Sequence, residues 1–257
     1  MKIVTWNVNS IRTRLERLQS WIASDAPDIV CLQELKCQDS EYPTDEIGAL
    51  GYHSAIFGQR TYNGVAIISK FPIVDIQRGF PDGWDDAQAR LIAGTIGNWR
   101  VVSVYVPNGG EMNSDKYQYK LEWLDHFLLY LKTECTPQQP IILCGDYNVA
   151  ADELDVANLS AWENTSLYNP EVCGRLQHLR DWGLTDMVRK HHPGGRIYTW
   201  WDYRQLAFPK NDGLRIDHIL ASQPLADLSL GARVVRDQRK GVKPSDHAPV
   251  EATFDNA

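Results

Sequence analysis

The feature of this sequence that most constrains its fold is the alternation of short β-branched apolar runs with segments of helical periodicity. Runs typical of strands occur at 2–8, 28–33, 65–69, 91–96, 101–106, 141–144, 216–222 and 248–254. Many of these runs are apolar almost throughout, which is typical of strands that are covered on both faces. We therefore expect sheets that are buried between other layers.

Three segments carry the apolar spacing of amphipathic helices. They cover 11–22, which follows the cap-favouring Asn9-Ser10, then 114–135, and then 172–182, which ends at Gly183. No Gly/Ser-rich or Pro-rich linker and no repeat of 20–50 residues interrupts the chain. The pattern predicts one domain over 1–257, a layered α/β sandwich of two packed sheets with helices outside.

Composition excludes several classes of protein. A hydrophobic fraction of 43% and an aromatic fraction of 10% rule out a disordered chain. No apolar run approaches the roughly 20 residues of a membrane span, and the first residues lack the features of a signal peptide. The five cysteines are scattered without a C-x-x-C pair, which favours a reduced, cytoplasmic chain over a disulfide framework or a thiolate zinc site.

The charge balance argues against a generic binder of polyanions. Lys and Arg number 26 against 33 Asp and Glu, for a formal net charge of −7. Such binders usually carry a basic surface. A local basic rim, for which Arg90, Arg204, Lys240 and Lys243 are candidates, could still oppose this average.

Polar residues stand at the ends of the predicted strands, where Asp and Asn are otherwise disfavoured. Those that follow a strand are Asn7, Glu34, Asp146 and Asn148, and those that precede one are Asp217, Asp246 and His247. If the last two strands run antiparallel to the earlier ones, all of these ends meet at one rim. Each residue alone is more readily explained as a turn cap or a surface carboxylate, but their joint placement indicates a site.

Carboxylates and amides without thiolates suit a hard cation such as Mg²⁺ or Mn²⁺. Such a cation usually takes one or two carboxylates, keeps several waters and completes its shell with a substrate phosphate. The remaining Asp and Asn could orient a water, and the Asp–His pair could hold the phosphate or steer protons. Without a cation, four carboxylates at one rim would repel one another.

Eight motifs carry a resemblance to a known family. They are 6–9 (WNVN), 32–34 (LQE), 62–66 (YNGVA), 105–109 (YVPNG), 145–150 (GDYNVA), 198–204 (YTWWDYR), 214–217 (LRID) and 245–247 (SDH). Together they resemble the exonuclease III type of apurinic/apyrimidinic endonuclease, within the endonuclease/exonuclease/phosphatase superfamily. The resemblance runs from Lys2 to Phe254. It implies a four-layer α/β sandwich of two mixed β-sheets flanked by helices, the DNase I-like fold.

The resemblance also implies roles for individual residues. Glu34 is the principal metal ligand, and the metal side of the site comprises Asn7, Glu34, Asp146, Asn148, Asp246 and His247. Asp146 orients the attacking water beside Asn148, while His247, paired with Asp217, and Tyr105 contact the scissile phosphate. The implied cofactor is Mg²⁺, for which Mn²⁺ can substitute. Lys36 and His218 are interpreted as a solvated and a structural side chain.

The implied substrate is double-stranded DNA with abasic sites or blocked 3′ ends. We expect the protein to act as a monomer and to have no membrane partner. Trp200, Leu214 and Ile216 would form the pocket for a flipped-out sugar, and Tyr62, Arg90 and Arg204 would contact the groove or backbone. Gly110-Glu111 stands where a related enzyme has a basic residue, which leaves the grip on the duplex open. Three alternatives remain: mainly 3′-end processing with little abasic cleavage, a phosphatase of a small phosphorylated substrate, and a DNA-binding module without catalysis.

Overall fold

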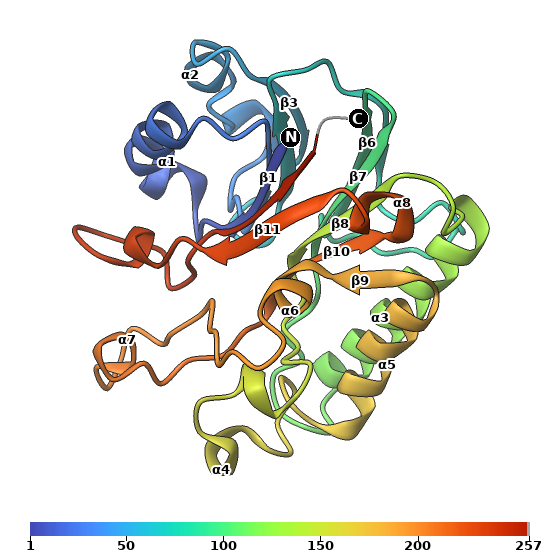
Figure 1. The fold of residues 1–257 in the computed structure, drawn as a ribbon, viewed down its shortest axis with the longest axis vertical. Helices are drawn as coiled ribbons and strands as arrows, with labels where there is room; N and C mark the ends of the chain where they lie inside the picture. The colour runs from blue at the N-terminus through green and yellow to red at the C-terminus, as the bar shows by residue number, and fades with distance from the viewer. Residues whose placement is uncertain (256–257) are drawn as a thin grey trace.

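Two six-stranded mixed sheets pack face to face in the computed structural model, which describes residues 1–255 (Figure 1). The first sheet has the order β11 (Ser229–Val234), β12 (Val250–Phe254), β1 (Lys2–Asn7), β2 (Ile29–Gln33), β4 (Val65–Ser69) and β3 (His53–Phe57). The second has the order β5 (Val74–Arg78), β6 (Leu91–Ile96), β7 (Trp99–Tyr105), β8 (Ile141–Asp146), β10 (Asp217–Ser222) and β9 (Leu184–Asp186).

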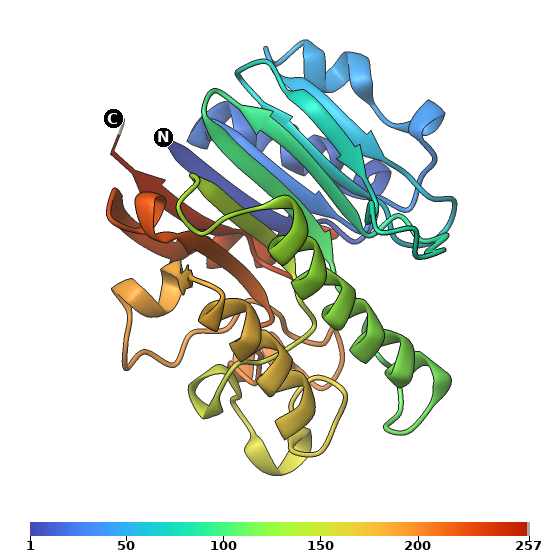
Figure 2. The ribbon, with the colours of Figure 1, turned by 90° about the vertical axis from the view of Figure 1, so that its right-hand side faces the viewer.

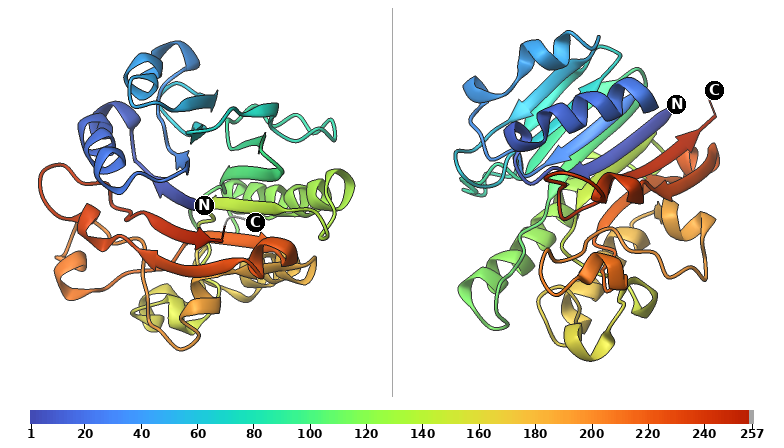
Figure 3. Two further views of the ribbon diagram at one scale, coloured as in Figure 1. Left: turned by 45° about the horizontal axis from the view of Figure 1, so that its top comes forward. Right: turned by 90° about the vertical axis from the view of Figure 1, so that its left-hand side faces the viewer.

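Helices cover the outer face of each sheet. The first sheet carries α1 (Ile11–Asp25) and α2 (Thr44–Gly48), and the second carries α3 (Asp115–Glu134) and α5 (Pro170–Asp181), as Figures 2 and 3 show. Shorter helices are α4 (Leu159–Trp162), α6 (Met187–His191), α7 (Ala207–Lys210) and α8 (Gln223–Ala226). The predicted α/β sandwich with two mixed sheets and flanking helices is confirmed, and the three predicted helices correspond to α1, α3 and α5.

Side-chain alternation along the central strands explains the layers. In β1, Ile3 belongs to the apolar core between the two sheets, whereas Val4 and Trp6 belong to the core beneath α1. Polar caps fix where the long helices begin: Ser114 accepts from the Tyr117 amide at α3, and Asn169 accepts from the Glu171 and Val172 amides at α5. Within residues 1–255, no helix is both long and apolar enough to span a membrane.

Strand directions bring the polar strand ends to one rim. β1 is parallel to β2, and β7 is parallel to β8; the hydrogen bond between Asn7 and Asp146 joins the ends of the two pairs at one edge. β12 runs antiparallel to β1, and β10 runs antiparallel to β8, so they start at that edge. The arrangement on which the predicted site depended is therefore present.

Candidate active site

The residues at the rim come from six different segments. Asn7, Tyr105 and Asp146 are the last residues of β1, β7 and β8, and Asp217 is the first residue of β10. In the second sheet, Asp146 lies directly between its register partners Tyr105 and Asp217. Glu34 follows β2, and His247 precedes β12.

Asn7 links the two sheets at the centre of this rim. Its Nδ2 donates to Glu34 Oε1 at 2.8 Å and to Asp146 Oδ2 at 2.9 Å. The Tyr105 hydroxyl donates to the same Glu34 oxygen at 3.0 Å. Burial, together with the nearby charges of Glu34 and Asp146, holds the pKa of Tyr105 well above its ordinary value, so this phenol is a donor at neutral pH.

His247 lies between two carboxylates. Its Nδ1 is 2.9 Å from Asp217 Oδ2, and its Nε2 is 3.7 Å from Asp146 Oδ2. Burial alone would lower the pKa of His247, but Asp217 and Asp146 outweigh it and raise that pKa. Burial also raises the pKa of Asp146, which the His247 charge only partly offsets. Because the pKa of His247 is raised, its imidazole is a cation at neutral pH.

A metal ion could be held where the two sheets meet. Glu34, Asp146 and His247 each offer one ligand atom, and these atoms lie within 4.8 Å of one another. The two carboxylates suit a divalent cation, whereas the His247 imidazolium would lie beside that cation without ligating it. Lys36, expected to be solvated, instead places its Nζ 2.8 Å from Glu34 Oε2 and 2.6 Å from Asn9 Oδ1. The Glu34 carboxylate thus already attracts one positively charged group, the Lys36 ammonium.

Asp246 lies beside this cluster. Its Oδ1 accepts from Asn9 Nδ2 at 2.9 Å and its Oδ2 from Trp200 Nε1 at 3.0 Å. The preceding Ser245 donates to the Asn7 carbonyl at 2.7 Å. Asp246 therefore ties the segment before β12 to the turn after β1 and to Trp200.

Asn148 is oriented from several sides. Its amide N–H donates to Asp146 Oδ1 at 2.9 Å, its Nδ2 donates to the Val106 carbonyl at 2.9 Å, and its Oδ1 accepts from Asn108 Nδ2 at 3.1 Å. Asn148 has a φ of +49°, in the left-handed region that asparagine tolerates. Asn108, which belongs to the 105–109 motif but had no role assigned from the sequence, is thus part of the site.

The residues expected to form a sugar pocket pack against one another. Leu214 and Ile216 are buried in an apolar cluster with Leu167. Trp200 packs on the same cluster. The rings of Trp162 and Trp200 meet edge to face, with their centroids 5.6 Å apart. The expected pocket residues are thus together, and neighbouring apolar side chains cover them.

The other three expected DNA contacts differ in exposure. Tyr62 is 68% exposed. Arg204 is also exposed, but its guanidinium pairs with Asp202 at 2.7 Å. Arg90 is buried instead: its guanidinium lies 4.8 Å from the Tyr105 ring centroid and donates to the Tyr105 carbonyl at 3.1 Å. Arg90 therefore holds both the ring and the backbone of Tyr105 in place.

His218 has a structural place, as interpreted from the sequence, and Asp186 and Trp201 are structural as well. His218 is buried, with Nε2 2.8 Å from the Val149 carbonyl. Asp186 caps α6 by accepting from the Arg189 amide and pairs with the buried Arg215 at 2.8 Å. Trp201 is in the core.

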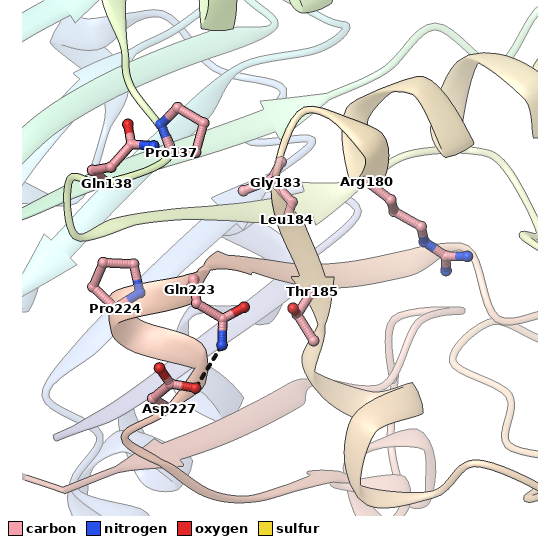
Figure 4. A pocket seen from close by; sticks show the side chains of 9 residues that line it. All are labelled: Pro137, Gln138, Arg180, Gly183, Leu184, Thr185, Gln223, Pro224 and Asp227. Carbon is pink, nitrogen blue, oxygen red and sulfur yellow. Dashed lines mark hydrogen bonds between the residues drawn. The ribbon is translucent and has the colours of Figure 1, made fainter.

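A surface hollow of about 620 Å³ lies away from the rim, between the end of α5, β9 and α8 (Figure 4). Its lining includes Arg180, Thr185, Gln223 and Asp227, and Gln223 Nε2 donates to Asp227 Oδ1 at 2.6 Å. None of the rim residues lines it, so it is separate from the candidate active site.

Comparison with known proteins agrees with this geometry. A family model for the Endonuclease/Exonuclease/phosphatase family matches residues 4–247. Exodeoxyribonuclease III of Haemophilus influenzae is 36% identical over 99% of this chain and 100% of its own.

Solved structures are similar over nearly the whole chain. A 3′-5′ exonuclease of Neisseria meningitidis is 41% identical with a TM-score of 0.97, covering 99% of this chain and 100% of its own. A Neisseria 3′ phosphatase bound to a product DNA hairpin is 40% identical with a TM-score of 0.97, covering 99% of each chain. An AP endonuclease from Archaeoglobus fulgidus is 37% identical with a TM-score of 0.97, covering 100% of each. The chain belongs to the endonuclease/exonuclease/phosphatase family and, with its exodeoxyribonuclease III relatives, is a hydrolase of the nuclease class.

Proposed function

We propose that this protein is a Mg²⁺-dependent DNA repair nuclease that cleaves the phosphodiester 5′ to abasic sites and trims 3′ ends of duplex DNA. The observation that carries the proposal is the joining of Glu34, Asp146 and His247 at one rim, with Asp217 behind the histidine. The relatives support it, since they include a 3′-5′ exonuclease, a DNA-bound 3′ phosphatase and an AP endonuclease. The proposal includes a monomer that acts in the cytoplasm.

Mg²⁺ fits the donor set of this site. Glu34 and Asp146 would hold it, and Asn7, Asn148, Asp246 and His247 would stand around it. The absence of a thiolate from this set favours Mg²⁺ over zinc, and Mn²⁺ can substitute. When bound, the cation supplies charge neutralisation at the phosphate and the leaving oxygen.

The chain's own residues account for water activation and phosphate binding. Asp146 would orient the attacking water, because one of its oxygens is held by the Asn148 amide and the other by Asn7. Its raised pKa brings this carboxylate closer to the basicity that suits a general base near neutral pH. The His247 imidazolium, held by Asp217, would neutralise a phosphate oxygen, and Tyr105 would donate to it.

A second candidate is mainly 3′-end processing with little abasic cleavage. It is favoured by the packing of Leu167 and Trp162 against the residues expected to receive a flipped-out sugar. Leu214 has no exposed surface and Ile216 is 2% exposed, so a flipped-out sugar could reach them only if neighbouring side chains moved. Gly110-Glu111, without a basic side chain, points the same way.

The test compares rates on three DNA duplexes: one with an internal abasic site, one with a 3′-phosphate and one with a recessed 3′-hydroxyl. The broad proposal expects hydrolysis of all three, and the second candidate expects hydrolysis of the two 3′ ends with little at the abasic site. Trp200→Ala should lower abasic cleavage more than 3′-phosphate removal. Turnover of soluble inositol phosphates with no activity on any duplex would overturn both candidates.

Metal dependence is tested separately by chelation. EDTA should abolish hydrolysis, and added Mg²⁺ or Mn²⁺ should restore it, because this site binds a divalent cation reversibly. Hydrolysis that continues after exhaustive chelation would contradict the metal assignment.

A further inference from the structure

A lysine is buried completely beneath the rim. Lys120 lies on the inward face of α3 and has no exposed surface. Its Nζ donates to the main-chain carbonyls of Ser166 at 2.5 Å, Asn148 at 2.6 Å and Asn108 at 3.2 Å. All three ammonium protons are thus directed at main-chain oxygens.

These carbonyls come from three segments that are far apart in the sequence. Asn108 is in the turn after β7, Asn148 is in the turn after β8, and Ser166 is in the loop that leads to α5. The stem of the lysine is enclosed as well, because a Cβ on Gly109 would stand 2.9 Å from Lys120 Cδ. The side chain therefore joins three loops at one point.

An apolar residue would be the ordinary choice at this position. Lys120 is flanked on the same face of α3 by the buried Tyr117 and Leu124, and burying an ammonium ion in such a place is costly unless its donors are satisfied. The three partners of the Lys120 ammonium are main-chain carbonyls of site loops and not a carboxylate. The ammonium therefore fixes the positions of these loops relative to one another.

Asn148 transmits this organisation to the reacting groups. Its carbonyl is held by Lys120, while its amide N–H donates to Asp146 Oδ1 at 2.9 Å and its Oδ1 accepts from Asn108 Nδ2 at 3.1 Å. Lys120 thereby also contacts a residue with left-handed backbone, since Asn148 has a φ of +49°. A shift of the Asn148 carbonyl would also move the Asn148 amide N–H, which orients the Asp146 carboxylate.

We infer that Lys120 is a positioning residue of the nuclease centre: by binding the carbonyls of Asn108, Asn148 and Ser166 it sets the orientation of Asp146 and Asn148. The inference rests on the proposed function for its catalytic consequence. Its structural part, the tethering of three loops by one ammonium, stands independently.

The kinetic test replaces Lys120 by methionine, which fills similar space without donors. On a duplex with a 3′-phosphate, Lys120→Met should lower kcat by roughly 10- to 100-fold while KM stays within about twofold, as for a displaced catalytic group whose substrate contacts remain. Lys120→Arg should fall between the wild type and Lys120→Met, because its planar fork keeps charge but cannot aim three donors at converging carbonyls. If Lys120→Met does not fold, kcat and KM of Lys120→Arg on the same duplex test the positioning role instead.

The matched control is Leu124→Ala, one turn along the same buried face of α3. It should lower the melting temperature by leaving a cavity but keep kcat within about twofold of the wild type. A folded Lys120 variant with wild-type kcat, or an equal loss of kcat in Leu124→Ala, would overturn the positioning role.

Amide hydrogen exchange separates this inference from the proposed function. In Lys120→Met without substrate, peptides covering 106–110, 146–150 and 164–168 should exchange faster than in the wild type, while Leu124→Ala should leave them unchanged. A wild type that hydrolyses none of the three duplexes refutes the proposed function alone. Unchanged exchange in the three segments refutes the tethering by Lys120.

Discussion

Replacing Asp217 by asparagine removes a negative charge from behind His247 but leaves an oxygen that can accept the same hydrogen bond. In the wild type, Asp217 is fully buried, and its two oxygens lie 2.9 and 3.1 Å from His247 Nδ1. After the change, Asp146, at 3.7 Å from Nε2, is the carboxylate that still pairs with the ring. The imidazolium is therefore destabilised while its orientation is retained.

The size of the effect follows from the two kinds of hydrogen bond. A bond between charged groups contributes about 1.5–3 kcal/mol, and a neutral one about 0.5–1.5 kcal/mol. The difference of about 1–1.5 kcal/mol corresponds to a loss of about 5- to 12-fold in kcat at about 1.4 kcal/mol per tenfold. Because Asp217 raises the pKa of His247, its loss lowers that pKa, and the cationic form disappears at a lower pH.

The assay is the pH dependence of kcat for 3′-phosphate removal by the wild type and Asp217→Asn. The variant should be slower at neutral pH, and its alkaline limb should move to lower pH. Asp186→Asn is the control, because Asp186 is also a buried carboxylate but pairs with Arg215 and Arg180 instead of His247. An alkaline limb that does not move in Asp217→Asn, or that moves equally in the control, would refute the assigned role of the pair.

Three further results are expected. Glu34→Gln should raise the Mg²⁺ concentration needed for half-maximal activity, because it removes a charge from the ligand set; an unchanged metal titration would contradict this. Burial alone would raise the pKa of Asp186, but Arg215, His218 and Arg180 hold it well below its ordinary value. This carboxylate therefore contributes stability above the unfolded pKa of about 4, lost as pH falls through the folded pKa, and urea unfolding of Asp186→Asn should depend less on acid. DNA affinity should fall only shallowly with salt; a steep slope would indicate many phosphate contacts.

The central strands of both sheets were predictable from the sequence, whereas the edge strands were not. β3 and β11 at the edges of the first sheet, and β5 and β9 at the edges of the second, lie outside the apolar runs that predicted strands. Edge strands face solvent along part of their surface, so their sequences need not be apolar: β5 is mostly exposed, and β9 has 3 residues. Tertiary pairing, rather than local pattern, makes these segments strands.

The site was predictable at strand ends and not in the loops that surround it. Asn7, Asp146 and Asp217 end or begin strands, so strand direction alone places them at one rim. Asn108 and Lys36 are in turns whose course depends on tertiary packing, and their hydrogen bonds to site residues leave no local pattern. Lys120 had a sequence signal, because it interrupts the apolar face of the helix three residues after Tyr117.

The net charge of −7 acquires a structural meaning when the partners of the basic residues are considered. Of the four residues suggested as a basic rim, Arg90 is buried behind Tyr105, Arg204 and Lys240 pair with neighbouring acids, and Lys243 is exposed.

Three of the four suggested rim cations are therefore buried or already paired with a carboxylate. The positive charge that can act on phosphate lies inside the rim, in the His247 imidazolium and in the cation that Glu34 and Asp146 are proposed to hold. In such an arrangement, undamaged duplex gains little from the surface, because few counterions are released on contact. Binding energy is then concentrated where hydrolysis takes place, so recognition depends on whether a phosphodiester can reach the centre between the two sheets.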